Sequence, residues 1–189
     1  MKTGRLEAFS DGVLAIVITI MVLEMKAPEE TDLKSLLETF PIFLSYLLSF
    51  IYLGIYWNNH HHLLQVTQKV NGRILWGNLH LLFWLSLIPF ATSWIGENYT
   101  AALPIALYGF ILLMAAIAYW ILEIQLIKFH DENFPLRKLT QRGAKEHLSI
   151  IIYLIAIPTA FLNYSISIAC FVVVAVMWIV PDRRLESVA

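Results

Sequence analysis

The chain has 189 residues, of which 59% are hydrophobic and only 14% are charged, whereas soluble domains carry roughly 25% charged residues. This composition excludes an ordinary soluble globule and indicates a membrane protein, because charge is absent from long stretches of the chain. The net charge of −1 provides no basic field for binding nucleic acid, and the single cysteine allows no intrachain disulfide.

The first predicted helix, residues 5–26, is unusual for a membrane span. Its uncharged core, residues 12–23, lies between Asp11 and Glu24 and is too short to cross a hydrocarbon layer of about 30 Å at about 1.5 Å per residue. A charged side chain within the membrane costs at least about 2.5 kcal/mol and normally faces protein or a water-filled cavity. We therefore expect this helix to lie inside an assembly, surrounded by more apolar helices.

One face of this helix carries a stripe of four residues at helical spacing, Ile16, Thr19, Ile20 and Leu23. Around an axis shared by several copies of the helix, branched aliphatic side chains form a gate that excludes water, and a threonine hydroxyl offers an oxygen to ions. Ordinary helix packing produces the same stripe, and on spacing alone it is the favoured interpretation.

Further uncharged stretches follow the first helix. The last of them, residues 147–181, is too long for one crossing and contains Pro158 and the pair Asn163-Tyr164, so it predicts a tight helical hairpin. The sequence thus predicts an all-helical membrane protein with a single domain, residues 1–189, and six spans. Their approximate bounds are 5–26, 39–67, 73–96, 98–127, 145–162 and 164–181.

Charge placement supports an even number of spans. Six crossings leave only Lys26 and Lys34, two of the thirteen basic residues, on one face of the membrane. The positive-inside rule then places both termini in the cytoplasm. The outer face collects acidic residues, which either form a vestibule that concentrates cations or are simply tolerated in outer loops. These residues are Glu24, Glu29, Glu30, Asp32, Glu38 and Glu97.

The second span ends in three consecutive histidines, His60, His61 and His62. Consecutive helical positions point about 100° apart, so the three cannot chelate one ion from a regular helix, and we expect no metal site. The polar stripe at helical spacing consists of Asn58, His61, His62 and Gln65. We expect this stripe to be a contact surface that histidine protonation would alter.

Glu123, toward the cytoplasmic end of the fourth span, has two explanations. Its nearness to Lys128 favours an interfacial residue, whereas a buried carboxylate suggests the alternative function, a proton-coupled secondary transporter.

On the third span Trp76, His80 and Trp84 repeat every four residues, and packing around a hydrogen-bonded histidine is the expected arrangement. Motifs for enzymatic catalysis, phosphate binding or dinucleotide binding are absent, so we expect neither an enzyme nor a cofactor.

The start of the first helix carries the most specific pattern in the chain. Arg5, Phe9, Ser10 and Asp11 form an R-x-x-x-F-S-D motif, which resembles the signature that opens the first helix in the transmembrane-protein-175 family of potassium channels. The resemblance extends to the acidic first loop, the histidine-containing second span and the six-span plan. It implies a potassium-permeable cation channel in a prokaryotic cytoplasmic membrane.

The resemblance also implies roles for individual residues. Ile16 falls where the family has its narrowest hydrophobic constriction, and Ile20 and Leu23 fall where it has further apolar rings. Thr19 falls where the family has a threonine tied to potassium selectivity. Because the chain carries one copy of the motif, the resemblance implies a homotetramer with K⁺ as the permeant ion. Geometry agrees, since one such helix cannot enclose a path and several related by cyclic symmetry can.

The motif residues need partners outside the first helix. Arg5 and Asp11 are six residues apart and nearly opposite on a helix, so they are poor partners for each other. We expect Ser10 and Asp11 to anchor the helix by bonding to polar residues at the cytoplasmic ends of the second and third spans. The candidates are Trp57, Asn58, His61, His62, Asn78 and His80. The alternative is that Ser10 and Asp11 cap the helix.

Overall fold

The computed structural model describes residues 3–131, 134 and 144–179, and the regular structure of these residues is entirely helical. The predicted all-helical membrane fold is confirmed. Residues 135–143, between the fourth and fifth predicted spans, and residues 180–181, at the end of the final predicted span, lie outside the described residues. In chain order the helices are α1 (Gly4–Leu23), α2 (Leu33–Glu38), α3 (Phe40–Gln65), α4 (Gly72–Ser86), α5 (Ile88–Glu97), α6 (Ala102–Phe129), α8 (Ala144–Thr159) and α9 (Tyr164–Ile179).

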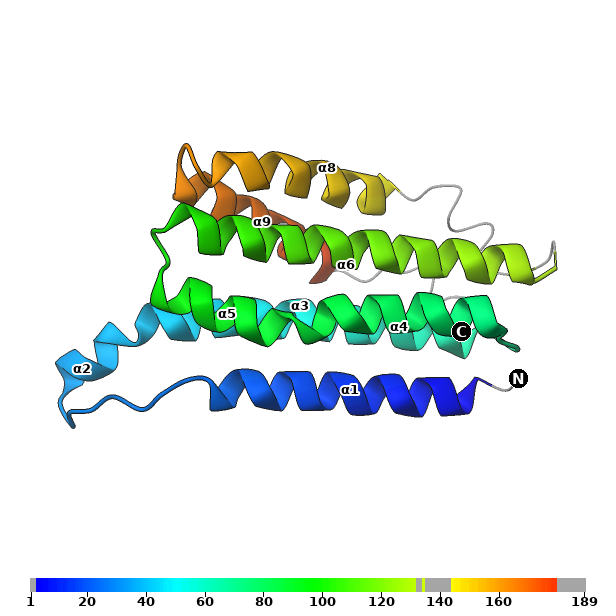
Figure 1. Cartoon of the computed structure of the whole chain (residues 1–189), viewed down its shortest axis with the longest axis horizontal. Helices are drawn as coiled ribbons and strands as arrows, with labels where there is room; N and C mark the ends of the chain where they lie inside the picture. Colours follow the sequence, from blue (N-terminus) through cyan, green and yellow to red (C-terminus); the bar gives the residue numbers. More distant parts are fainter. Residues whose placement is uncertain (1–2, 132–133, 135–143, 180–189) are drawn as a thin grey trace.

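The long helices correspond to the predicted spans. Four segments are long and apolar enough to cross a membrane, namely α1, α3, the α4–α5 pair and α6. The last two predicted spans coincide with α8 and α9, which have 16 residues each and, at about 24 Å, are shorter than these four segments. Figure 1 shows α1, the α4–α5 pair, α6 and α8 running along roughly one direction, with the short α2 outside the bundle at one end.

The third span is broken in two, which the sequence analysis does not anticipate. Pro89 lies in the first turn of α5 and has no backbone N–H, so one helical hydrogen bond is missing there. The N–H of Leu87 bonds to the carbonyl of Trp84 at 3.2 Å, which closes the end of α4. Beyond this break, α5 packs against both α1 and α3.

The hairpin predicted for the last two spans is present. The turn lies between α8 and α9, where the Asn163 side chain accepts a hydrogen bond from the backbone N–H of Ser165 at 3.0 Å. Ser167 then donates to the carbonyl of Ala156 at 2.8 Å and ties α9 to α8. Buried hydroxyls bind this hairpin to α3, because Tyr52 donates to the Phe171 carbonyl at 2.6 Å.

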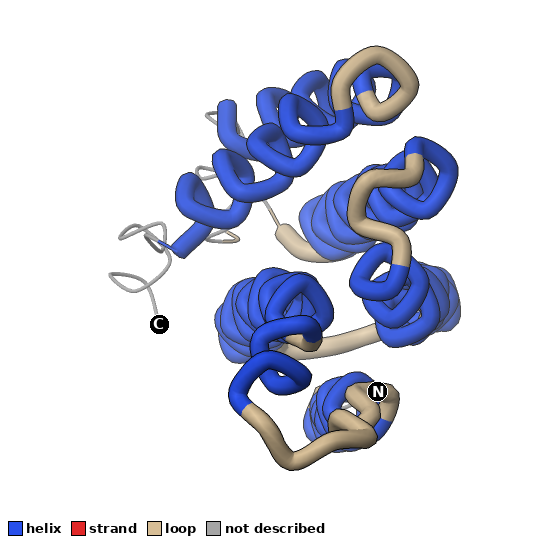
Figure 2. The backbone as a smooth tube through the Cα atoms, turned by 90° about the vertical axis from the view of Figure 1, so that its left-hand side faces the viewer, coloured by secondary structure: helices blue, strands red, loops and turns tan. Residues whose placement is uncertain are grey.

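The arrangement of helices leaves α1 at the edge of the subunit. In the end-on view of Figure 2, α1 lies beside the N mark at the lower edge, with the hairpin on the far side of the bundle. Helix α6 packs against α4, α5, α8 and α9, whereas α1 packs against α3, α4 and α5. The helix with the most specific sequence motif is therefore peripheral in a single subunit.

Gly109 of α6 tests the packing of the bundle. A Cβ atom added there would lie 2.8 Å from the ring of Phe171 and 3.3 Å from Ile157, and Phe171 is fully buried. We expect Gly109→Ala to reduce the free energy of unfolding by about 1–3 kcal/mol through overpacking, measured as a lower melting temperature of the purified protein. Gly54→Ala is the matched control, because its Cβ would meet no atom within 4 Å. A melting temperature no lower in Gly109→Ala than in Gly54→Ala contradicts this prediction.

Candidate functional site

Helix α1 has one face packed in the bundle and an opposite face that is exposed. The exposed face carries the predicted stripe, with exposed fractions of 59% for Ile16, 40% for Ile20 and 79% for Leu23. The buried face consists of Leu6, Ser10, Leu14, Val17 and Met21. The predicted gate residues therefore lie on the face of α1 that the helices of their own subunit leave largely uncovered.

Thr19 lies on the same exposed face of α1. Its hydroxyl donates a hydrogen bond to the carbonyl of Ile16 at 2.8 Å, one turn back along the helix. Because the hydroxyl proton is used within the helix, the lone pairs of the oxygen are directed away from it. Thr19 thus presents a hydroxyl oxygen with free lone pairs on the exposed face of α1.

Ser10 is buried in the contact between α1 and α4. Asn78 of α4 donates from Nδ2 to the Ser10 Oγ at 2.9 Å, and Ser10 donates to the carbonyl of Leu6 at 2.9 Å. The Asn78 Oδ1 lies 2.7 Å from Nε2 of His60, so His60 of α3 is the donor in this contact. A chain of three buried hydrogen bonds therefore connects α3, α4 and α1.

A second set of contacts connects α1 to α3 at a more exposed position. Trp57 donates from Nε1 to an Asp11 oxygen at 3.0 Å. One turn away on each helix, Nδ1 of His61 lies 3.2 Å from a Glu7 oxygen, and the Trp57 and His61 rings stack with centroids 5.9 Å apart. The two contacts are four residues apart on each helix and match an antiparallel pairing of α1 and α3. Together they fix the register of the two helices.

The structure assigns different positions to the other candidate partners. His80 accepts a hydrogen bond from Trp84 on its own helix, with the two ring nitrogens 2.9 Å apart. Asn58 and His62 are half-buried on α3, and the structure shows neither of them bonded to Ser10 or Asp11. Of the six candidates, Trp57 and Asn78 contact these two residues in the part of the chain that the structure describes.

The remaining motif residues, Arg5 and Phe9, lie on the exposed side of α1. The alternative that Ser10 and Asp11 cap the helix is wrong, because α1 begins at Gly4 with Thr3 at its N-cap. Both residues therefore lie inside the helix, one to two turns from its start. Their side chains are available for contacts between helices.

His60 and Glu7 also take part in these contacts, although the sequence pattern did not indicate them as partners. His60 lies seven residues after Leu53 and four before Leu64, and both leucines are buried in the core. This spacing places His60 on the core side of α3, whereas the polar stripe selected the opposite, more exposed positions. The helical spacing of each histidine from the apolar residues of α3, and not from its other polar residues, is the sequence signal that identifies His60 as a buried residue.

Glu123 of α6 is buried, with an exposed fraction of 7%. Protein therefore surrounds this carboxylate, in contrast to the expectation of an interfacial residue. Among the described residues, no group of three His, Cys, Asp or Glu side chains is arranged to hold a metal ion. His60 bonds to Asn78 of α4 whereas His61 contacts Glu7 of α1, so these neighbouring histidines point in different directions, as expected from a regular helix.

Comparisons with known proteins agree on one family. A family model described as endosomal/lysosomal potassium channel TMEM175 matches residues 5–89, which include the R-x-x-x-F-S-D motif and the helices that contact it. A potassium channel of Chryseobacterium sp. (strain P1-3) is 56% identical over 187 residues, which cover 99% of this chain and 97% of that protein.

A solved structure and a human protein are also similar. The crystal structure of a lysosomal potassium-selective channel TMEM175 homolog from Chamaesiphon minutus matches with a TM-score of 0.83 and 28% identity, over 96% of this chain and 97% of that chain. The human endosomal/lysosomal proton channel TMEM175 is 38% identical over 96 residues, which are 44% of this chain and 19% of the human protein.

Proposed function

Because this chain belongs to the TMEM175 family of potassium channels, we propose that it conducts K⁺ through a pore lined by α1 from four identical subunits. The observation that carries the proposal is the orientation of α1. Its stripe of Ile16, Ile20 and Leu23 faces away from the subunit's own helices, while its other face is packed. The exposed face of such a helix is covered when several copies of the subunit pack around a common axis.

The gate in this proposal is a set of apolar rings. Four copies each of Ile16, Ile20 and Leu23 surround the axis, and a constriction lined by branched aliphatic side chains loses its water and stops ion flow. The network of Ser10, Asn78 and His60 anchors one end of α1, so a small tilt of the helix changes the width of the rings. The proposal requires no carbonyl selectivity filter.

Electrical recording distinguishes this channel from the proton-coupled transporter. Purified protein in planar bilayers is expected to give discrete current steps whose reversal potential follows the K⁺ gradient. Saturable, proton-coupled uptake without current steps contradicts the proposal. A pH gradient at symmetric K⁺ measures proton conduction in the same bilayer, which is relevant because the human relative is named as a proton channel.

We assign the membrane orientation from charge. Under the positive-inside rule, both termini face the cytoplasm of a prokaryotic cell and the end of α1 near Glu24 faces outward. Figure 1 shows that α1 runs from the N mark to the α2 end of the bundle. Labelling of single cysteines placed at either end of α1, in intact cells with a membrane-impermeant reagent, tests this orientation.

Thr19 provides a test of ion selectivity. Thr19→Val keeps the shape of the side chain but removes the hydroxyl oxygen that this exposed position presents. We expect the K⁺/Na⁺ permeability ratio to fall about five-fold, equivalent to about 1 kcal/mol, measured as a shift of the bi-ionic reversal potential. Thr19→Ser keeps the hydroxyl and should preserve the ratio. An unchanged reversal potential in Thr19→Val removes Thr19 from the selectivity mechanism.

A further inference from the structure

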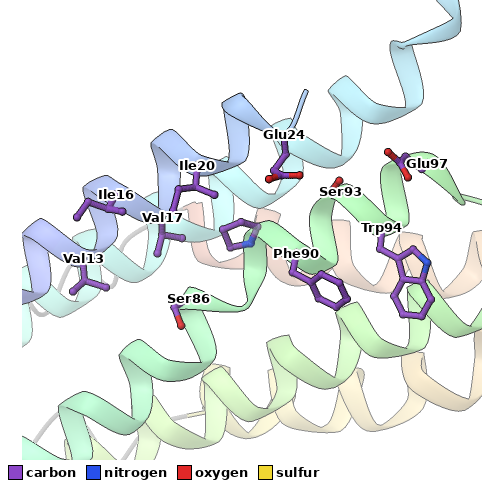
Figure 3. A pocket seen from close by; sticks show the side chains of 11 residues that line it. Val13, Ile16, Val17, Ile20, Glu24, Ser86, Phe90, Ser93, Trp94 and Glu97 are labelled. Carbon is purple, nitrogen blue, oxygen red and sulfur yellow. The ribbon is translucent and has the colours of Figure 1, made fainter. Parts of the chain in front are cut away.

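A large groove runs along α1 beside the proposed gate. It has a volume of about 600 Å³ and lies between α1 and the α4–α5 pair, as Figure 3 shows. Ile16 and Ile20 belong to its wall, so the groove opens beside the exposed stripe of α1. A volume of this size is within the range of sites that bind small organic molecules.

The wall opposite α1 is aromatic. Phe90 and Trp94 lie one turn apart on α5, with ring centroids 6.0 Å apart, and Figure 3 shows both side chains along the α5 side of the groove. Together with the isoleucines and valines of α1, they make the middle of the groove apolar. This surface favours a ligand with a hydrophobic body, and the faces of the aromatic rings also attract a cationic group.

One end of the groove is acidic. Glu24, directly after α1, and Glu97, the last residue of α5, both line it at the α2 end of the bundle. Both side chains are exposed, and no lysine or arginine is among the described residues that line the groove. Two carboxylates beside an apolar, aromatic surface are complementary to a molecule that carries positive charge and apolar arms.

We propose that this groove is a binding site for amphipathic organic cations, such as quaternary ammonium ions with alkyl arms, and that an occupied groove blocks the adjacent pore. The cationic centre lies near Glu24 and Glu97, and the alkyl arms pack against Phe90, Trp94 and Ile20. A lipid acyl chain or a helix of a neighbouring subunit would use the apolar surface without using the two carboxylates. The blocking effect rests on the proposed channel function, whereas the binding does not.

Equilibrium binding of tetrapentylammonium to the protein in lipid nanodiscs tests the site without any current. We expect the double variant Glu24→Gln/Glu97→Gln to raise the dissociation constant at least about ten-fold. Glu29→Gln/Glu30→Gln is the matched control, because it removes the same charge from the loop after α1 without altering the groove. Trp94→Leu should weaken binding several-fold, and tetramethylammonium, which lacks the apolar arms, should bind far more weakly.

Equal affinity of wild type and Glu24→Gln/Glu97→Gln for tetrapentylammonium overturns the proposal. An absence of saturable binding also overturns it, and is the result expected if lipid or a neighbouring helix fills the groove.

In planar bilayers, tetrapentylammonium added on the side of Glu24 should block K⁺ current. The variants should rank in the same order for block as for binding. Binding that depends on the two glutamates, in a protein without K⁺ current, supports the site and rejects the proposed channel function. K⁺ current that is insensitive to bound tetrapentylammonium rejects the coupling of this groove to the pore.

Discussion

Ile16→Asn is expected to raise K⁺ flux through reconstituted protein at least about ten-fold, because a ring of amide side chains retains water where a ring of isoleucines excludes it. A ten-fold change corresponds to only about 1.4 kcal/mol of the barrier, a modest part of the cost of moving an ion through a dry constriction. The measurement is K⁺ flux into liposomes at matched protein content, followed by single-channel recording.

Ile151→Asn is the matched control for this experiment. Ile151 lies on α8 and has an exposed fraction of 52%, close to the 59% of Ile16, so the same substitution is made at a similarly exposed apolar position far along the chain. The control should leave flux unchanged. An equal effect of the two substitutions would mean that Ile16 has no special place in the permeation path.

Asn78→Leu is expected to lower the melting temperature by several degrees. The leucine has a similar volume, but it leaves the buried Ser10 hydroxyl without its donor and His60 without its acceptor. Each buried polar group that loses its partner costs about 1–3 kcal/mol. Size-exclusion melting curves of the purified protein measure the effect.

Asn58→Leu is the control for Asn78→Leu, because Asn58 is a half-buried asparagine on α3 outside the Ser10 network. The double variant Asn78→Leu/His60→Leu should lose less stability than the sum of the two single variants, since each substitution removes a partner of the other. Additive losses, or equal melting temperatures of Asn58→Leu and Asn78→Leu, contradict the role assigned to this network.

Several features of the protein follow from local sequence. Charge-free stretches predict the spans because a bilayer excludes unpaired charge, and Pro158 with Asn163 predicts the hairpin because both residues interrupt a long apolar helix. The short segment between Asp11 and Glu24 indicates an unusual helix for the same reason. These properties depend on residues close together in the chain, so they need no knowledge of the fold.

Contacts between distant residues required the tertiary structure. Six polar residues near the ends of two spans are reasonable partners for Ser10 and Asp11, yet the rotation of α3 and α4 brings only Asn78 and Trp57 to them. The unexpected His60 joins the network through Asn78. Spacing along one helix gives relative directions of side chains, not the direction of any side chain toward a neighbouring helix.

Hydrophobic length and charge position act residue by residue along the chain, so they are sufficient to predict a six-span membrane protein with an unusual first helix. The helix packing was needed to show that Ile16, Ile20 and Leu23 lie on the uncovered face of α1, and that α1 and α5 leave a groove with Glu24 and Glu97 at one end. These features depend on how helices rotate and pack against one another, and the periodicity of a single helix does not contain that information.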